Sequence, residues 1–312
     1  MFRILLKSSI SKQIAPNRIQ SLKCSTTPNF DASKNSSRFR LLIKPCLFTF
    51  ATCATSFTAA TIVNYETEKR KKSRLFSMFE NRKYREKNWL EKLKQSWSVL
   101  KDSQKIFIGI AILNGLCFIC WRIPRFHPFM CRNFLTNVST NSIPLLPMIL
   151  SNFSHHSLTH LVMNMIVLYS FCDLAVRLFG RENFLALYLS SGVISSLSGC
   201  LYKVISNISS PSLGASGAIL GILGATCLEK PDISLMIVFF PFFTFSSYTA
   251  LKSILLFDAL GLILRWHFFD HAAHIGGTLS GVYYSHHFKE YLNKNKFLIT
   301  KYWNDFKNKF QF

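Results

Sequence analysis

Acidic residues are scarce in this 312-residue sequence, which has 15 Asp and Glu against 37 Lys and Arg and a formal net charge of +22. An excess of this size fits either nucleic-acid binding or the flanks of membrane segments. Residues 106–288 hold only nine of the basic residues and six of the acidic ones, and the aromatic residues lie in the apolar runs rather than among the basic clusters. We therefore expect a protein of the lipid bilayer, with no nucleic-acid partner.

Paired cysteine motifs are also lacking. The nine cysteines are scattered and odd in number, so neither a zinc ribbon nor a disulfide framework is indicated. Cys117-x-x-Cys120 lies in an apolar run, which favours buried thiols over a redox pair. His155, His156 and His160 cluster, but no Glu completes an H-E-x-x-H zinc motif. We expect neither a metal nor another cofactor.

The N-terminal region has no acidic residue before Asp31, although it holds five Lys and Arg within its first 30 residues and several Ser and Thr. It also lacks a compact apolar stretch and a small-residue cleavage site, which excludes a secretory signal. Acid-poor, basic, Ser-rich composition is typical of a mitochondrial transit peptide. We assign residues 1–40 to a transit peptide or disordered segment.

Long apolar runs fill most of the remaining chain, which has 49% hydrophobic residues. About 20 apolar residues span a bilayer core, so residues 41–63 predict one transmembrane helix, followed by a basic linker at 64–104. Residues 105–290 form the core, and 291–312 a basic tail. We expect an all-α membrane protein with six core helices preceded by one extra transmembrane helix, the six lying at about 105–121, 158–179, 182–205, 214–229, 248–264 and 271–288.

Two connections and one short helix break this regular pattern. The long connection at 122–157 is expected to have structure of its own, and the Pro-containing run 235–245 is expected to be interfacial or partly inserted. The 214–229 helix would reach only about 24 Å, against a bilayer core of about 30 Å. It should therefore begin below the membrane surface, after the polar segment 206–212, which suits a watery cavity.

Polar and ionisable side chains inside a membrane are costly, and are therefore candidates for function. Ser216 lies between glycines at the start of the 214–229 helix, and His274 lies at the start of the last core helix. A neutral imidazole can remove a serine proton near neutral pH. His160 and Asn164, four residues apart, share one helix face and offer donors to an oxyanion, as do the N–H groups around Ser216. Peptide-bond hydrolysis needs all of these parts.

Each feature has an ordinary structural explanation: a serine between glycines commonly serves helix packing, and a membrane histidine is often structural. Taken together, the segments HSLTHLVMN (156–164), GASGAILG (214–221) and HAAHIGG (271–277) strongly resemble the rhomboid intramembrane serine proteases. The extra helix, the transit-like N-terminus and the sequence Phe268-Phe269-Asp270-His271 are similar to the mitochondrial, presenilin-associated rhomboid-like branch.

The resemblance implies specific roles. Ser216 would be the nucleophile and His274 the general base, while His160, Asn164 and the Ser216 amide would form the oxyanion hole. Glycines that allow close helix packing would be Gly217, Gly221, Gly277 and Gly281. The protein would be a multi-pass protein of the mitochondrial inner membrane that cuts single-pass transmembrane substrates.

One position departs from many bacterial rhomboids, which carry a tyrosine one turn after the serine, stacked on the base. This chain has Leu220 there, so His274 needs another support, for which His155, Asp270 and His271 are candidates from the surrounding shell. Asp258 invites a triad with Ser216 and His274, but rhomboids work with a dyad, and we expect a structural or water-facing role for this carboxylate.

Two other classes of function compete with proteolysis. A rhomboid-like binder or chaperone could hold membrane clients without cutting them, although the presence of both Ser216 and His274 counts against it. A transporter would predict paired broken helices in corresponding halves, and the sequence shows no such internal repeat.

Overall fold

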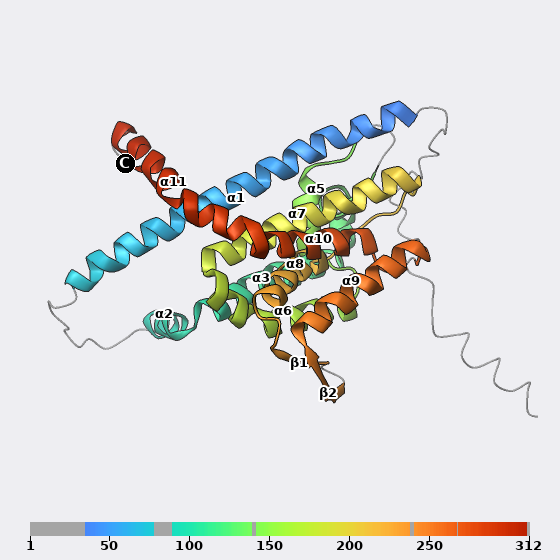
Figure 1. Ribbon diagram of the computed structural model, residues 1–312. Coiled ribbons are helices and arrows are strands. Elements are labelled where there is room, and N and C mark those ends of the chain that lie inside the picture. Colours follow the sequence, from blue (N-terminus) through green and yellow to red (C-terminus); the bar gives the residue numbers. More distant parts are fainter. Residues whose placement is uncertain (1–34, 78–88, 139–141, 238–239, 267, 311–312) are drawn as a thin grey trace, which may run out of the picture.

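The computed structural model describes residues 35–77, 89–138, 142–237, 240–266 and 268–310. Most of the predicted transit segment lies outside these ranges, as does part of the predicted linker. The described chain is a helical bundle with one small hairpin (Figure 1). The predicted class, an all-α membrane protein, is confirmed. The described helices are, in order, α1 Asn35–Ser77, α2 Trp89–Val99, α3 Asp102–Cys120, α4 His127–Asn133, α5 Leu146–Leu150, α6 Leu158–Phe179, α7 Arg181–Ser206, α8 Ser216–Glu229, α9 Ser247–Ile263, α10 His271–Tyr283 and α11 Lys289–Phe310.

All six predicted core segments are helices, formed by α3, α6, α7, α8, α9 and α10. Among the described residues, four helices are long and apolar enough to cross a membrane, at Phe39–Ser73, Asp102–Cys120, Leu158–Phe179 and Arg181–Ser206. The α8 helix is shorter, with 14 residues, or about 21 Å. The number of crossings therefore stays a prediction, while the order and place of the helices agree with it.

The last core helices pack unusually closely because glycines face one another. A Cβ on Gly281 would lie 1.8 Å from the Gly221 carbonyl oxygen, and one on Gly277 would lie 2.2 Å from that of Gly217. On the opposite side of α8, a Cβ on Gly217 would lie 1.9 Å from Ser195 Oγ of α7. Backbones of α8 and α10 thus touch directly, which sets the spacing of the two helix starts that carry Ser216 and His274.

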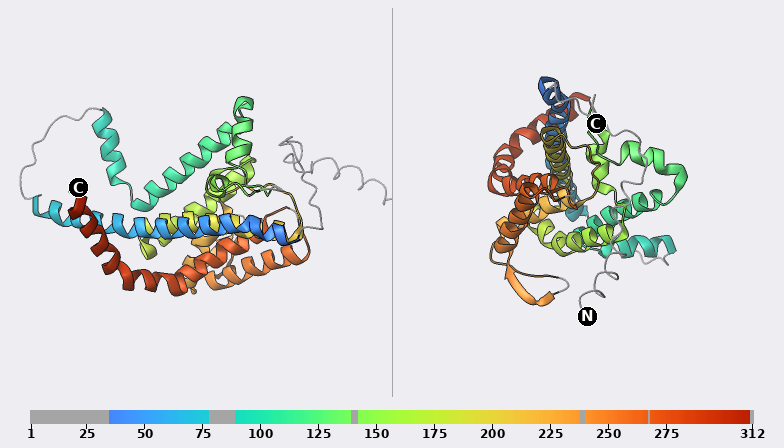
Figure 2. Two further views of the ribbon diagram at one scale, coloured as in Figure 1. Left: turned by 90° about the horizontal axis from the view of Figure 1, so that it is seen from above. Right: turned by 90° about the vertical axis from the view of Figure 1, so that its right-hand side faces the viewer.

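The extra helix α1 is longer than the predicted 41–63 segment at both ends. It packs along α7, on the side away from α8 and α10, and α11 crosses it near its C-terminal end (Figures 1 and 2). Trp303 and Lys307 of α11 donate to Glu66 of α1 at 2.9 and 3.0 Å. The predicted basic tail is therefore an ordered helix that docks on α1, and the predicted linker begins inside α1.

The connection 122–157 has structure of its own, as expected. It contains α4, α5 and two short 3₁₀ turns, η2 at Pro124–Phe126 and η3 at Ser151–Phe153. Trp121 donates through Nε1 to Ser154 Oγ at 2.7 Å and anchors the end of α3 to this connection. At the C-terminal end of the core, η4 at Tyr284–Phe288 is a π-turn that joins α10 to α11.

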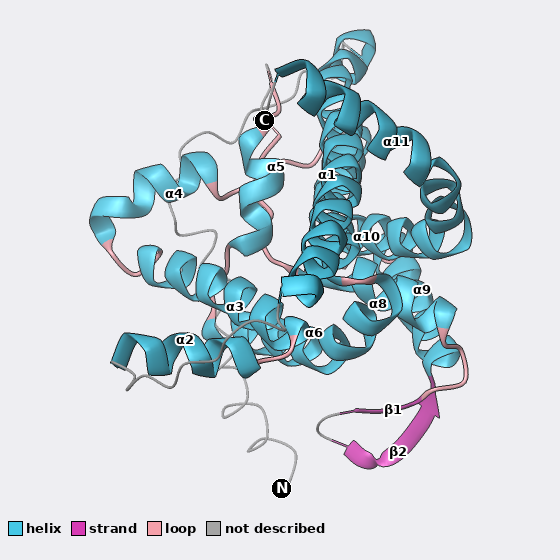
Figure 3. Cartoon of the chain, turned by 90° about the vertical axis from the view of Figure 1, so that its left-hand side faces the viewer, coloured by secondary structure: helices cyan, strands magenta, loops and turns pink. Residues whose placement is uncertain are grey.

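Residues 235–245, which the sequence analysis expected to be interfacial or partly inserted, have a secondary structure that it did not predict. They form an antiparallel hairpin, β1 Ser234–Ile237 and β2 Phe240–Ser246, which projects beyond α9 (Figure 3). The run is rich in β-branched and aromatic residues, which favour strands, and a register shift after Met236 bends the ladder. Periodicity alone does not distinguish so short an apolar run from a helix.

Candidate active site

Ser216 is the first residue of α8, and the backbone before it requires glycine. Gly214 has φ of +136°, a conformation that only glycine adopts freely. A Cβ there would also lie 2.7 Å from the His160 ring. The loop is fixed at this point because the Gly214 amide donates to the Ser151 carbonyl at 2.9 Å. The Ser216 hydroxyl is thereby held at a helix N-terminus, where backbone N–H groups have no partner within the helix.

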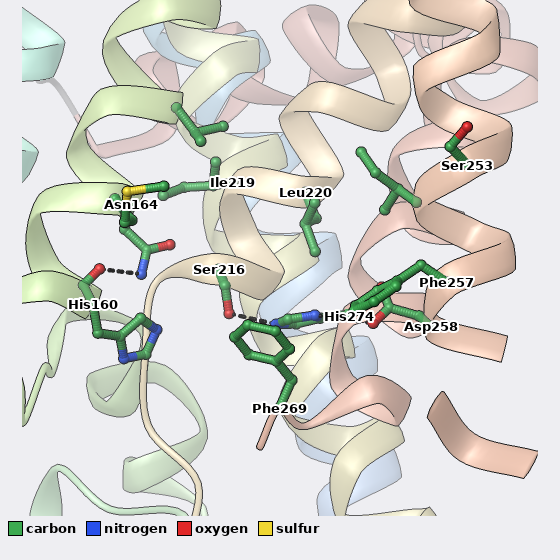
Figure 4. Close-up of a pocket in the computed structure, with 13 residues that line it drawn as sticks. His160, Asn164, Ser216, Ile219, Leu220, Ser253, Phe257, Asp258, Phe269 and His274 are labelled. Atoms are coloured by element: carbon green, nitrogen blue, oxygen red, sulfur yellow. Dashed lines mark hydrogen bonds and ion pairs between the residues drawn. The ribbon is translucent and has the colours of Figure 1, made fainter. Parts of the chain in front are cut away.

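His274 lies in the first turn of α10 and faces Ser216 (Figure 4). The distance between its Nε2 and Ser216 Oγ is 2.9 Å. Asp270 caps this helix by accepting from the Ala273 amide at 3.2 Å, a standard N-cap interaction. The structure thus brings together Ser216 and His274, which are 58 residues apart in the chain and which the sequence analysis paired.

Asp258 of α9 lies behind the His274 ring, buried, with 2% of the side chain exposed. Its Oδ1 is 3.3 Å from His274 Nδ1 and 2.7 Å from His271 Nδ1. If both Nδ1 atoms carry protons, Asp258 accepts from both rings, which leaves His274 Nε2 as an acceptor for the Ser216 hydroxyl. The sequence analysis favoured a role for Asp258 apart from His274, whereas the geometry places it against the imidazole.

Phe269 supplies an aromatic contact that the sequence analysis did not assign. Its ring centroid lies 5.7 Å from that of His274 at an interplanar angle of 38°. Leu220 lines the same cavity one turn after Ser216. The ring that lies against His274 therefore comes from the segment before α10, and the only sequence signal was the position of Phe269 in the aromatic run that precedes the histidine motif.

The proposed oxyanion donors lie beside Ser216, and Asn164 is already engaged. Its Nδ2 lies 3.0 Å from His155 Nε2 and 2.9 Å from the His160 carbonyl oxygen. His155 is fully buried, and its Nδ1 has no partner among the described residues. The His160 ring lies edge-on to His155, with 4.9 Å between centroids. His155 therefore contacts Asn164 rather than supporting His274.

A cavity of about 390 Å³ surrounds these groups. It lies between α6 and α9, with Ser216 and His274 in its wall, and its lining is otherwise largely apolar. The lining residues from the four helices and the preceding loop are His160, Met163, Asn164, Val167, Ser216, Ile219, Leu220, Ser253, Ile254, Phe257, Asp258, Phe269 and His274.

The remaining predicted residues take other positions. His271 contacts Asp258, and Asp270 faces away from the His274 ring, toward α7 and the loop before Ser216. Among the described residues, no group of three or more His, Cys, Asp or Glu side chains is arranged to hold a metal ion.

The fold and the site define a class: a helical membrane bundle in which a serine and a histidine meet where two closely packed helices begin. A match to the Rhomboid domain covers residues 144–290, which include every residue of the cavity wall. The presenilin-associated rhomboid-like protein, mitochondrial, of Rattus norvegicus is 37% identical over 97% of this chain and 86% of its own length.

Two further relatives agree. The human protein of the same name is 40% identical over 85% of this chain and 72% of its own length. Rhomboid protein 1, mitochondrial, of Saccharomyces cerevisiae is 32% identical over 59% of this chain and 53% of its own. The chain belongs to the rhomboid family, and within it to the mitochondrial, presenilin-associated rhomboid-like branch. It is a mitochondrial multi-pass membrane protein.

Proposed function

We propose that the chain is a serine endopeptidase of the mitochondrial inner membrane that hydrolyses peptide bonds in or near transmembrane helices. The observation that carries this proposal is the 2.9 Å contact between Ser216 Oγ and His274 Nε2 in the wall of a largely apolar cavity. Hydrogen-bond contact between a hydroxyl and a base is what an activated serine requires.

The reaction follows from these positions. His274 Nε2 takes the Ser216 proton as Oγ attacks the substrate carbonyl carbon, and the carbonyl oxygen becomes an oxyanion that accepts from the Ser216 amide, with His160 and Asn164 as further donors. The C–N bond then breaks, and the imidazolium returns the proton to the leaving amine. Water, deprotonated by His274, releases the acyl group from Ser216 and restores the hydroxyl.

Asp258 has a positioning role in this proposal. Acceptance from His274 Nδ1 fixes the ring tautomer and stabilises the imidazolium that forms during attack. His271 Nδ1 lies at a shorter distance from the same Asp258 oxygen, so the buried negative charge interacts with both imidazole rings. In this proposal Asp258 acts as a third group beside the Ser216–His274 dyad that the resemblance implied.

Single-pass transmembrane proteins are the substrates that this site suits best. The cavity lies between α6, which is long and apolar enough to cross a membrane, and α9. A scissile bond must leave its own helix to present its carbonyl, so segments weakened by glycine are preferred. The test is cleavage of a transmembrane reporter by the full chain in liposomes. Cleavage that is lost in Ser216→Ala supports the protease, whereas client binding without any cleavage by the native chain supports the rhomboid-like binder.

A further inference from the structure

A second polar cluster lies beside the Ser216–His274 pair and is not used in the reaction described above. Lys203, in the last turn of α7, has only 5% of its side chain exposed, although lysine is among the most costly residues inside a membrane protein. Its Nζ lies 2.9 Å from Asp270 Oδ2. Lys203 also donates to Ser212 Oγ, and Ser212 Oγ donates to the same Asp270 oxygen.

The three residues of this cluster come from three separate segments. Lys203 belongs to α7, Ser212 to the loop that leads into Ser216, and Asp270 to the N-cap of α10. Ser212 is also bridged to Thr136 by two backbone hydrogen bonds of 2.9 Å. The cluster therefore ties the chain entering Ser216 to the start of the helix that carries His274.

The surrounding structure is shaped to admit the Asp270 carboxylate. Gly199 lies one turn before Lys203 on the same helix face, and a Cβ there would lie 2.9 Å from Asp270 Oδ2. Burial works against the ionised carboxylate, but the Lys203 ammonium and the hydrogen bonds from Ser212 and the Ala273 amide lower the pKa of Asp270 to about 2. Both carboxylate oxygens of Asp270 accept hydrogen bonds at this junction, Oδ2 from Lys203 and Ser212 and Oδ1 from the Ala273 amide.

We propose that Lys203 is a positioning residue: by holding Asp270 and Ser212 together, it keeps the Ser216 loop in register with the first turn of α10. The glycine-packed α8 and α10 fix the distance between the two helices, and the cluster fixes the loops at their starts. The catalytic consequence rests on the proposed protease function, because a shift of about 1 Å between a nucleophile and its base costs roughly 10²-fold in rate.

The cluster is tested by hydrogen exchange on the full-length chain, which needs no activity. Lys203→Met removes the charge and keeps most of the side-chain length. It should increase amide exchange in both 207–216 and 270–275, since both segments lose the same partner. Lys289→Met is the matched control, because it breaks an ion pair with Glu229 at the far end of α8, and it should leave both segments unchanged. Exchange that rises in one segment alone, or in neither, overturns the proposal.

The consequence for the reaction is measured on the same variants. In Lys203→Met, kcat for a transmembrane reporter should fall about 10- to 100-fold, with KM within about twofold, because the apolar cavity that binds substrate is untouched. Lys203→Met/Asp270→Asn should be less impaired than the single variant, since it no longer leaves a buried charge unpaired. An unchanged kcat in Lys203→Met contradicts the positioning role.

A second variant, which keeps Lys203, distinguishes loss of the cluster from misfolding caused by replacing the lysine. Gly199→Ala should displace the Asp270 carboxylate and reproduce the exchange increase in both segments, in a smaller measure and with α7 intact. If neither segment responds, the cluster does not hold the two loops. Cleavage that persists in Ser216→Ala would instead count against the protease proposal, and would leave the exchange experiment standing as a test of the cluster.

Discussion

Phe269 places its ring against the His274 imidazole, with 5.7 Å between the centroids. In this chain the residue one turn after the serine is Leu220, which cannot stack on a ring, so the aromatic contact comes from the opposite side of the site. The Asp258 carboxylate holds the other edge of the same imidazole. Together the two contacts account for how His274 is oriented toward Ser216.

Replacing Phe269 should therefore slow the reaction without abolishing it. We expect Phe269→Ala to lower kcat by about 2- to 13-fold, since an aromatic pair contributes about 0.5–1.5 kcal/mol beyond its buried area. Phe269→Tyr should retain most of the rate. Phe129→Ala is the matched control, because Phe129 pairs with Phe134 and does not line the cavity. Equal losses in the two alanine variants would show that the effect is not specific to the imidazole contact.

Replacing Asp258 should have the larger effect. Asp258→Asn keeps the shape of the side chain but removes the charge that stabilises the imidazolium, so we expect kcat to fall by at least about 10²-fold, within the range known for such carboxylates. Asp173→Asn is the control, because Asp173 accepts a hydrogen bond from Ser103 away from the site. This variant should retain full activity. A native rate in Asp258→Asn would show that Ser216 and His274 act as a dyad without Asp258.

Asn164 is expected to act on the oxyanion, although its amide now contacts His155 and the His160 carbonyl. Asn164→Ala should lower kcat by roughly 10². His155→Ala should cause a smaller loss, since it removes the acceptor that holds the amide in place. Both are measured by single-turnover cleavage of one reporter, and an Asn164→Ala enzyme of native rate would remove this residue from the oxyanion hole.

Gly281 should be intolerant of any side chain. A Cβ there would meet the Gly221 carbonyl oxygen at 1.8 Å, so Gly281→Ala should force α10 from α8 and cost about 1–3 kcal/mol in unfolding free energy. Gly115→Ala has nothing within 4 Å of the added atom and should be neutral or stabilising. Thermal unfolding in detergent measures both, and a stable Gly281→Ala protein would contradict the close packing.

The sequence predicted the features that local pattern determines. The six core helices follow from apolar runs. The pairing of Ser216 with His274 was predicted because their two motifs together resemble the rhomboid proteases. The hairpin at 234–246 was missed because a short apolar run fits either a strand or a helix. The structure describes residues only from 35 onward, so the transit segment stays a prediction.

The contacts that surround His274 could not be predicted from local sequence pattern, because they join separate segments. Asp258 is one acid in an apolar helix, and its distance from His274 depends on how α9 packs against α10. Phe269 precedes the histidine motif, but which way its ring points is set by the turn before α10. Lys203 and Asp270 are 67 residues apart, and nothing in either segment marks them as partners. Such tertiary relationships require the packed bundle.

The most direct test of the central claim is mass-spectrometric mapping of the full-length protein after reaction with a serine-directed fluorophosphonate in liposomes. The account predicts one phosphonylated residue, Ser216, with labelling lost in Ser216→Ala and reduced by at least about 10³-fold in His274→Ala, since the hydroxyl is unreactive without its base. Labelling of Ser216 at the native rate in His274→Ala, or the absence of any label on Ser216, would contradict it.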